Sequence, residues 1–158
     1  MILDQEKPSI FYQLEFDCTI VVDTREQDPL FTPDEKNVIF RKLSAGDYSV
    51  LGLENLIAIE RKSGDLFTSL GTDRKRFMSA VKRMLNLKWK GLLIEMPESR
   101  IYTPQSFSSI SPSSIYGSLC SLEVRGFHIY YAPNRERARA WVISRLSRFY
   151  RYHREGKI

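Results

Sequence analysis

Hydrophobic residues follow two different periods along the chain. In the first part the apolar runs are short and rich in β-branched residues, which is typical of strands. The predicted strands are residues 18–23, 38–43, 47–50 and 56–62. In the last of these runs Ile57 and Ile59 share one face, as alternate residues of a strand do. Turn residues separate the runs, so these strands are expected to form a meander.

The period then changes to that of a helix. Phe77, Val81 and Met84 define one stripe of a helix predicted for residues 73–89, and basic residues occupy its other faces. Gly91 is expected to end this helix, because glycine is common just after a helix C-terminus.

Two more helices and two more strands are predicted in the rest of the chain. One helix begins at Ser111-Pro112, where a capping serine precedes a proline in the first turn, and stops at Gly126. Asn134 caps a last helix. The predicted strands are residues 92–96 and 127–131. This order predicts an α/β fold in which helices cover both faces of a mixed sheet.

The composition narrows the class of protein. The 158 residues are 42% hydrophobic and 27% charged, which is typical of a globular chain and predicts one domain with a core from about residue 17 to residue 150. No apolar run approaches the roughly 20 residues that span a bilayer. Residues 1–16 lack the apolar stretch of a signal peptide. We therefore expect an intracellular location (cytoplasm, nucleoid or nucleus) and no membrane partner.

Cysteine and histidine are scarce. Cys18 and Cys120 lie in apolar stretches without neighbours at metal-ligand spacing, so both are expected to be buried, reduced thiols. The two histidines, His128 and His153, are too few for a histidine-rich zinc site and disfavour a Ser-His-Asp triad.

Charge is separated along the sequence. Residues 1–60 carry 5 basic and 12 acidic side chains, whereas residues 61–158 carry 19 basic and 7 acidic ones. An acidic part can gather metal ions and a basic part can hold a polyanion, although each basic helix taken alone is better explained as a solvated face. Because arginine is concentrated on two predicted helices, nucleic acid is a candidate partner.

The tripeptide Glu60-Arg61-Lys62 at the end of the fourth strand carries the candidate chemistry. Glu60 and Lys62 are expected on one face of the strand, roughly 6–7 Å apart, with Arg61 on the other. Together with a second carboxylate, Glu60 can bind a hard divalent cation. Lys62 can then orient water or offset charge on a phosphate, which suits phosphodiester hydrolysis.

Two positions are candidates for the second carboxylate. Asp47 follows Gly46 and lies 13 residues before Glu60, so a strand, a turn and a returning strand can bring the two acids together. Asp23 ends the first strand at the rim of the sheet, and Glu26 follows three residues later. Each acid taken alone is also explained by a solvated strand edge or a local ion pair.

The ordered set is more specific than its parts. Asp23-Thr24-Arg25-Glu26, Gly46-Asp47 and Glu60-Arg61-Lys62 each begin or end an apolar strand. In this order they resemble the nuclease domain of the XPF/Hef family of structure-specific endonucleases, a branch of the PD-(D/E)xK nucleases. That family's pattern is Gly-Asp, a variable spacer, Glu-Arg-Lys, three residues and Asp. The resemblance covers nearly the whole chain and implies a restriction-endonuclease-like fold.

The resemblance also implies an activity. It is that of a hydrolase, a DNA endonuclease that depends on Mg²⁺ or Mn²⁺ and cuts branched, flap or fork DNA in repair or recombination. The site residues that it implies are the metal ligands Asp47, Glu60 and Asp23, the water-activating Lys62, and the supporting residues Arg61 and Glu26. A structural ion pair explains Arg61 equally well. The DNA contacts expected from the resemblance and from the basic tail are Arg25, Arg76, Arg145 and Arg148.

The chain departs from the family pattern in two ways. Two residues rather than three separate Lys62 from Asp65, so Asp65 is either a shifted site residue or a helix N-cap. The 158 residues leave no room for the helix-hairpin-helix pair that many family members carry after the nuclease domain. The arginine-rich tail is a candidate substitute for part of its DNA binding, and an ordinary surface helix is the alternative.

The family's nuclease domains pair, so a homodimer is expected. The last two helices offer four apolar residues for its interface: Leu119, Leu122, Trp141 and Phe149. Two other functions stay open. One is a non-catalytic, nuclease-like module that binds DNA or pairs with an active partner, and the other is a protein-interaction domain with a basic surface.

Overall fold

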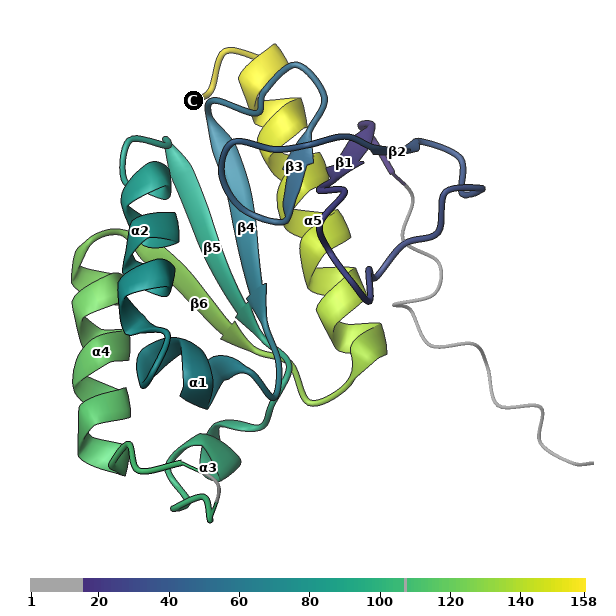
Figure 1. Cartoon of the computed structure of the whole chain (residues 1–158). Coiled ribbons are helices and arrows are strands. Elements are labelled where there is room, and N and C mark those ends of the chain that lie inside the picture. The colour runs from purple at the N-terminus through teal and green to yellow at the C-terminus, as the bar shows by residue number, and fades with distance from the viewer. Residues whose placement is uncertain (1–15, 107) are drawn as a thin grey trace, which may run out of the picture.

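A six-stranded mixed sheet forms the centre of the protein (Figure 1). The structure, a computed structural model, describes residues 16–106 and 108–158. The strands are β1 (Ile20–Val22), β2 (Val38–Phe40), β3 (Tyr48–Val50), β4 (Ile57–Lys62), β5 (Trp89–Ile94) and β6 (Phe127–Tyr131). Their order across the sheet is β2-β1-β3-β4-β5-β6. β3 is antiparallel to both of its neighbours, and the other neighbouring strands are parallel.

The predicted meander is wrong for the first three strands. β2 lies parallel to β1 at the edge of the sheet, and β3 lies antiparallel on the other side of β1. A parallel pair needs a crossover connection of about a dozen residues or more. Residues 23–37, which link β1 to β2, are long enough for that connection.

Helices cover both faces of the sheet, as predicted (Figure 1). One face packs against α5 (Arg135–Arg154). The other packs mainly against α1 (Leu66–Leu70), α2 (Arg74–Met84) and α4 (Pro112–Val124), with the short α3 (Glu98–Ile101) at the end of that layer. None of the helices in the described residues is long and apolar enough to cross a membrane. The segment tested for a signal peptide lies almost entirely outside the described residues.

Strand β4 sends alternate side chains into the two layers. Ile57 and Ile59 belong to the α5 layer, and Ala58 belongs to the layer of α1, α2 and α4. The first three residues of β4 are buried and the last three are only half-buried. The same alternation turns Glu60 and Lys62 towards α2, and Arg61 towards the other face.

The predicted helix caps are confirmed. Ser111 Oγ accepts a hydrogen bond from Ser114 N–H at 3.2 Å, and Asn134 Oδ1 accepts one from Arg137 N–H at 2.9 Å. Gly126 follows the end of α4, and its φ of 91° lies in the left-handed region that glycine favours.

The predicted helix 73–89 is wrong at its C-terminal end. α2 ends at Met84, and Trp89 already begins β5. Gly91 therefore lies inside a strand, where packing explains it: a Cβ atom there would lie 2.8 Å from the Trp141 ring and 2.9 Å from the Trp89 ring. The glycine gives room to two tryptophans and does not end a helix.

The four apolar residues that were predicted to form a homodimer interface belong to the core. Leu119, Leu122, Trp141 and Phe149 are at most 7% exposed. The interface predicted for these four side chains is therefore wrong. Cys18 is buried, as expected, whereas Cys120 is only half-buried, and both are free thiols.

Candidate active site

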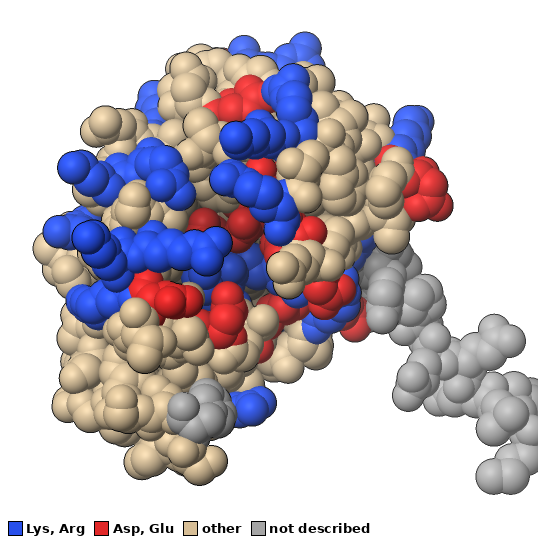
Figure 2. All heavy atoms as spheres, in the orientation of Figure 1, with Lys and Arg blue, Asp and Glu red and all other residues tan. Residues whose placement is uncertain are grey.

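An open groove of about 570 Å³ lies at the C-terminal end of β4. Figure 2 shows a hollow with carboxylates inside it and lysine and arginine side chains around it. Nine residues predicted from the sequence line the groove: Asp23, Arg25, Glu26, Asp47, Glu60, Arg61, Lys62, Asp65 and Arg76. Two predicted DNA contacts, Arg145 and Arg148 on α5, do not line it.

A hairpin brings Asp47 beside Glu60, as predicted. β3 and β4 are antiparallel, and Tyr48 pairs with Ile59, so Asp47 lies opposite Glu60. Two backbone contacts fix Asp47: its N–H donates to Ile59 O at 2.8 Å, and its Oδ2 accepts from Arg61 N–H at 2.8 Å. The acid is therefore held by the backbone of the strand that carries Glu60.

Gly46 makes this approach possible. Its φ of 72° lies in the left-handed region that side chains disfavour. A Cβ atom at this position would lie 2.8 Å from Ala58 Cβ and 3.1 Å from Ile59 O. Both the turn and the close contact between the two segments therefore require glycine directly before Asp47.

The two carboxylates resist ionisation. Burial, together with the negative charge of Glu60, raises the pKa of Asp47 from 3.8 to about 8. Burial also raises the pKa of Glu60, against the lowering effect of Lys62. Two half-buried acids that compete for ionisation are stabilised in their charged form by a cation between them.

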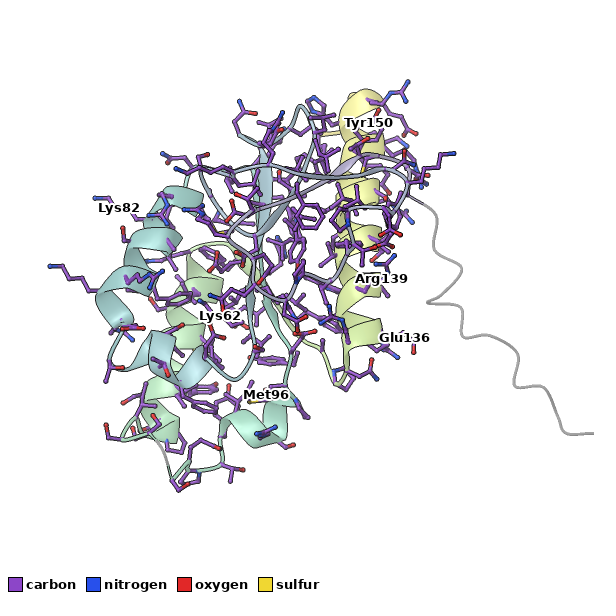
Figure 3. All side chains as sticks on the ribbon, turned by 45° about the vertical axis from the view of Figure 1, so that its right-hand side comes forward. Lys62, Lys82, Met96, Glu136, Arg139 and Tyr150 are labelled. Carbon is purple, nitrogen blue, oxygen red and sulfur yellow. The ribbon has the colours of Figure 1, made fainter. Side chains whose placement is uncertain are left out.

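Lys62 lies in the groove beside Glu60 (Figure 3). Its Nζ is 3.6 Å from Glu60 Oε1, 3.6 Å from Asp65 Oδ2 and 5.3 Å from the centre of the Phe77 ring. The side chain is 14% exposed, whereas Lys82 points outward from α2 (Figure 3). Lys62 is thus a largely buried cation next to a half-buried acid, as expected from the strand alternation.

Asp65 lies at the start of α1 and at the rim of the groove. It occupies the N-cap position of α1, but its side chain makes no capping hydrogen bond. Its Oδ1 instead accepts from Ser63 N–H at 3.0 Å, and its Oδ2 lies near Lys62. The shortened spacer therefore still brings this carboxylate to the groove, 60% exposed at its rim.

Arg61 points to the other side of the strand and forms an ion-pair network. Its Nη2 lies 2.6 Å from Glu95 Oε2, and its Nη1 lies 3.5 Å from Glu26 Oε1. The side chain is 7% exposed. Among the described residues, the buried Oε2 of Glu26 has no hydrogen-bond partner. The structural ion pair considered for Arg61 is confirmed, and Glu26 keeps one oxygen unused.

Asp23 lies at the edge of the groove with both carboxylate oxygens engaged. Its Oδ1 accepts from Leu43 N–H at 2.8 Å, and its Oδ2 accepts from Arg25 Nε at 2.8 Å. Arg25 also donates to Leu43 O at 2.8 Å. These contacts brace the loop after β1. A role for Asp23 in metal binding stays a prediction.

Two residues of the site were missed as functional candidates. Arg83 lines the groove two helical turns after Arg76, and the small Ala80 lies between them on the same face of α2. The seven-residue spacing was the available signal. Glu95 anchors Arg61, and its signal was its place at the end of a strand parallel to β4.

The carboxylates in the described residues supply only part of a metal shell. No group of three His, Cys, Asp or Glu residues in that part of the chain is arranged as a metal cluster. A pair of carboxylates still fits Mg²⁺, because this ion keeps several waters and is bound through one or two carboxylates plus phosphate oxygens. The donor set therefore suits Mg²⁺ or Mn²⁺ better than a closed zinc site.

Comparisons with known proteins agree with this fold. The model of the ERCC4 domain family matches residues 22–144. The structure of XPF from Aeropyrum pernix is similar to this chain with a TM-score of 0.61 at 24% identity, over 83% of this chain and 60% of that one. XPF from Aeropyrum pernix in complex with DNA gives a TM-score of 0.64 at 23% identity, over 85% and 65%.

These identities establish the fold alone, and the chain spans less than two thirds of both structures. No curated protein sequence matches it. The predicted restriction-endonuclease-like α/β fold and the resemblance to the XPF/Hef nuclease domain are confirmed.

Proposed function

The chain belongs to the ERCC4 domain family, and on that premise we propose that it is a metal-dependent DNA endonuclease, a hydrolase of phosphodiester bonds. One observation carries the proposal. The half-buried pair Asp47 and Glu60 lies beside Lys62 in a groove with arginines along its wall. This arrangement suits a phosphate substrate, because the acids can bind a cation while the lysine and the arginines offset the phosphate charge.

Asp47 and Glu60 would hold Mg²⁺ or Mn²⁺. When bound, the ion would polarise a phosphoryl oxygen and lower the pKa of the attacking water. Asp23 is a weaker candidate ligand, because it would have to release Arg25 or the Leu43 N–H. Glu26 Oε2, which has no hydrogen-bond partner among the described residues, is a further candidate to bind the cation or one of its water ligands.

Lys62 and Arg61 have different tasks in this proposal. The Lys62 ammonium beside Glu60 holds a water molecule or a phosphate oxygen at its Nζ and offsets charge there. Arg61 is a positioning residue: its backbone N–H fixes Asp47, and its guanidinium holds Glu95 and Glu26. Substitution of Arg61 would therefore disturb the acids without removing a group that touches the phosphate.

The DNA backbone is proposed to follow α2. Arg76 and Arg83 lie on the groove face of this helix, and Arg25 lies across the groove. Arginine binds phosphate through two parallel hydrogen bonds. Branched, flap or fork DNA, and a part in repair or recombination, are proposed from the family resemblance. Such a substrate places the enzyme inside the cell, in the cytoplasm, nucleoid or nucleus.

A single nuclease domain with its core at about residues 17–150, and a homodimer, both remain proposals. Because the four residues first considered for a dimer are buried, its interface must use another surface. The outward face of α4 carries two exposed large apolar residues, Tyr116 at 59% and Val124 at 89%. That face is the better candidate.

Cleavage assays test the proposal directly. Flap, fork, splayed and linear duplex substrates are incubated with Mg²⁺, with Mn²⁺ and with EDTA. We expect cleavage only with metal, and we expect Asp47→Asn to lower it by at least about 100-fold, since it removes the charge that binds the cation. Asp34→Asn, a change at an exposed acid outside the groove, is the control.

Two outcomes would reject this function. Equal cleavage in EDTA, or full activity of Asp47→Asn, would exclude the metal mechanism. DNA binding without any cleavage would support the non-catalytic module instead, although the acids and Lys62 of the motif are all present. A protein-interaction domain predicts neither cleavage nor an effect of metal.

A further inference from the structure

A second pocket, of about 690 Å³, lies on the other side of the turn between α1 and α2. The α1–α2 turn and Arg74 form one side of it, and α4 forms the opposite side. Five hydroxyl-bearing residues line it: Thr72, Ser109, Ser114, Ser118 and Ser121. None of its lining residues in the described chain is acidic. We name it the Arg74 pocket.

Arg74 is fixed on one side only. Its Nη1 donates to Ser118 Oγ at 2.9 Å and, more weakly, to Leu70 O at 3.4 Å. Ser118 in turn donates its hydroxyl proton to Ser114 O at 2.9 Å. These bonds orient the guanidinium and use one of its nitrogen atoms. Within residues 16–106 and 108–158, Arg74 has no acidic partner.

The Arg74 pocket is adjacent to the catalytic groove. Asp73 and Arg76 line the groove, whereas Thr72 and Arg74 line the pocket. Only the turn between α1 and α2 therefore separates the two depressions. Arg74 and Arg76 are two residues apart at the start of α2, so one flexible polyanion is long enough to contact both.

We propose that the Arg74 pocket binds a phosphodiester group of a DNA strand that extends beyond the catalytic groove. An oriented arginine with remaining N–H donors, surrounded by hydroxyl groups and without a competing acid, suits a phosphate oxygen. A role as a mere brace between α1 and α4 explains the Ser118 bond, but not an open pocket free of acids. The inference rests on the proposed nuclease function.

Gly117 allows a test that leaves Arg74 in place. It lines the pocket, and a Cβ atom there would have no neighbour within 4 Å. Gly117→Glu and Gly117→Gln add side chains of nearly equal size, and both have a better helix propensity than glycine. They differ in charge, so the pair separates repulsion of a phosphate from simple filling of the pocket.

Binding is measured by fluorescence anisotropy in EDTA, with labelled flaps whose single-stranded arm increases in length. For the wild type we expect affinity to rise in a step once the arm reaches the pocket. Gly117→Glu should abolish that step and weaken binding of long arms by roughly ten-fold, because like charges then oppose each other. Gly117→Gln should keep most of the step, and short arms should bind all three proteins alike.

Salt dependence provides a second readout. Arg74→Gln should lower the slope of log affinity against log salt by about 0.7–0.9 for long arms, the value of one phosphate contact, and leave the slope for short arms unchanged. An unchanged slope, or equal losses in Gly117→Glu and Gly117→Gln, would overturn the proposal. So would stabilisation of the wild type by inorganic phosphate without any length step, which would indicate a free phosphate as the ligand. If the wild type neither binds nor cleaves any arm, the nuclease function itself fails.

Discussion

Helices α2 and α5 are both rich in basic residues, but they differ in what their charges contact. On α2, Arg76 and Arg83 face the groove at the end of β4, and within the described residues neither forms an ion pair. On α5, three arginines pair with acids from the first part of the chain: Arg135 with Asp28, Arg139 with Glu35 and Arg151 with Asp17. Figure 3 labels Arg139 on α5, across the sheet from Lys62 and α2.

The difference shows how charge separated along a sequence is distributed by folding. Three acids of the first part, Asp17, Asp28 and Glu35, pair with arginines of α5 and offset part of its charge. Within the described residues, Arg76 and Arg83 of α2 have no ion-pair partner, although seven acids also line their groove: Asp23, Glu26, Asp28, Asp47, Glu60, Asp65 and Asp73. Arg145 and Arg148 also have local partners, since they lie over the rings of Trp141 and Tyr152. A basic helix is thus a candidate phosphate site only where its neighbours leave the charge uncompensated.

The pKa values of the acids beside the two helices are shifted in opposite directions. Burial and Glu60 raise the pKa of Asp47 to about 8. Burial tends to raise the pKa of Glu35 as well, but the hydrogen bonds from Arg139 and Thr32 and the charge of Arg139 together outweigh burial and lower this pKa. Ionisation of Glu35 therefore stabilises the fold, whereas ionisation of Asp47 destabilises the metal-free protein.

The largest expected effect concerns this contrast in stability. Because its folded-state pKa is raised, Asp47 should destabilise the metal-free protein progressively as the pH rises from about 4 to about 8. Asp47→Asn should therefore be more stable than the wild type at pH 8 by about 2–4 kcal/mol, and equally stable at pH 4. Urea unfolding in EDTA measures this. If the difference in unfolding free energy between Asp47→Asn and the wild type did not change with pH, the ionisation of Asp47 would not be destabilising.

The next effect is on cleavage. Arg76→Gln with Arg83→Gln on α2 should lower cleavage by about 30- to 100-fold, as expected for the loss of two phosphate contacts. The matched pair Arg145→Gln with Arg148→Gln on α5 should change it less than about three-fold. Initial rates at low substrate concentration measure both. An equal loss in the α5 pair would break the comparison and restore Arg145 and Arg148 as the DNA contacts predicted from the sequence.

The smallest effect concerns the stability of the α5 side. Arg139→Gln should lower the free energy of unfolding by about 1–2 kcal/mol at pH 7, since it removes an ion pair and a contact 4.6 Å from the Phe31 ring centre. Arg83→Gln, which has no such partners, should stay within about 0.5 kcal/mol of the wild type. Because the pKa of Glu35 is lowered, the cost of Arg139→Gln should shrink as the pH falls below about 4. If Arg83→Gln were equally costly, α2 would also depend on its charges for folding.

Several features of the site could be predicted because they depend on local rules. Strand alternation assigned Glu60 and Lys62 to one face and Arg61 to the other, and the contacts of Arg61 with Glu95 confirm it. The turn at Gly46 brought Asp47 to β4, as the antiparallel register requires. The caps Ser111 and Asn134 followed from side-chain chemistry alone.

Other features depended on distant residues. The α2 stripe suggested a longer helix, but Trp89 is drawn into β5 by its parallel pairing with Ile57. Gly91 suggested a helix end, but its lack of a side chain accommodates Trp141, which is 50 residues away in sequence. Leu119 and Trp141 suggested a dimer surface, but each is covered by the sheet on which its own helix packs.

The sequence by itself determined the order of the six strands and the three long helices, the family and the set of acids around Glu60-Arg61-Lys62, because hydrophobic period, caps and motif spacing are local properties. The short helices α1 and α3 were not part of the predicted order. Only the tertiary structure decided that β2 lies parallel to β1, and which arginines of the basic part face the groove. The physical reason is that the charge of an arginine is offset by the acids that lie near it in space, which can be far away in the sequence. Arginines on α2 line open depressions, whereas Arg139 on α5 contacts the carboxylate of Glu35.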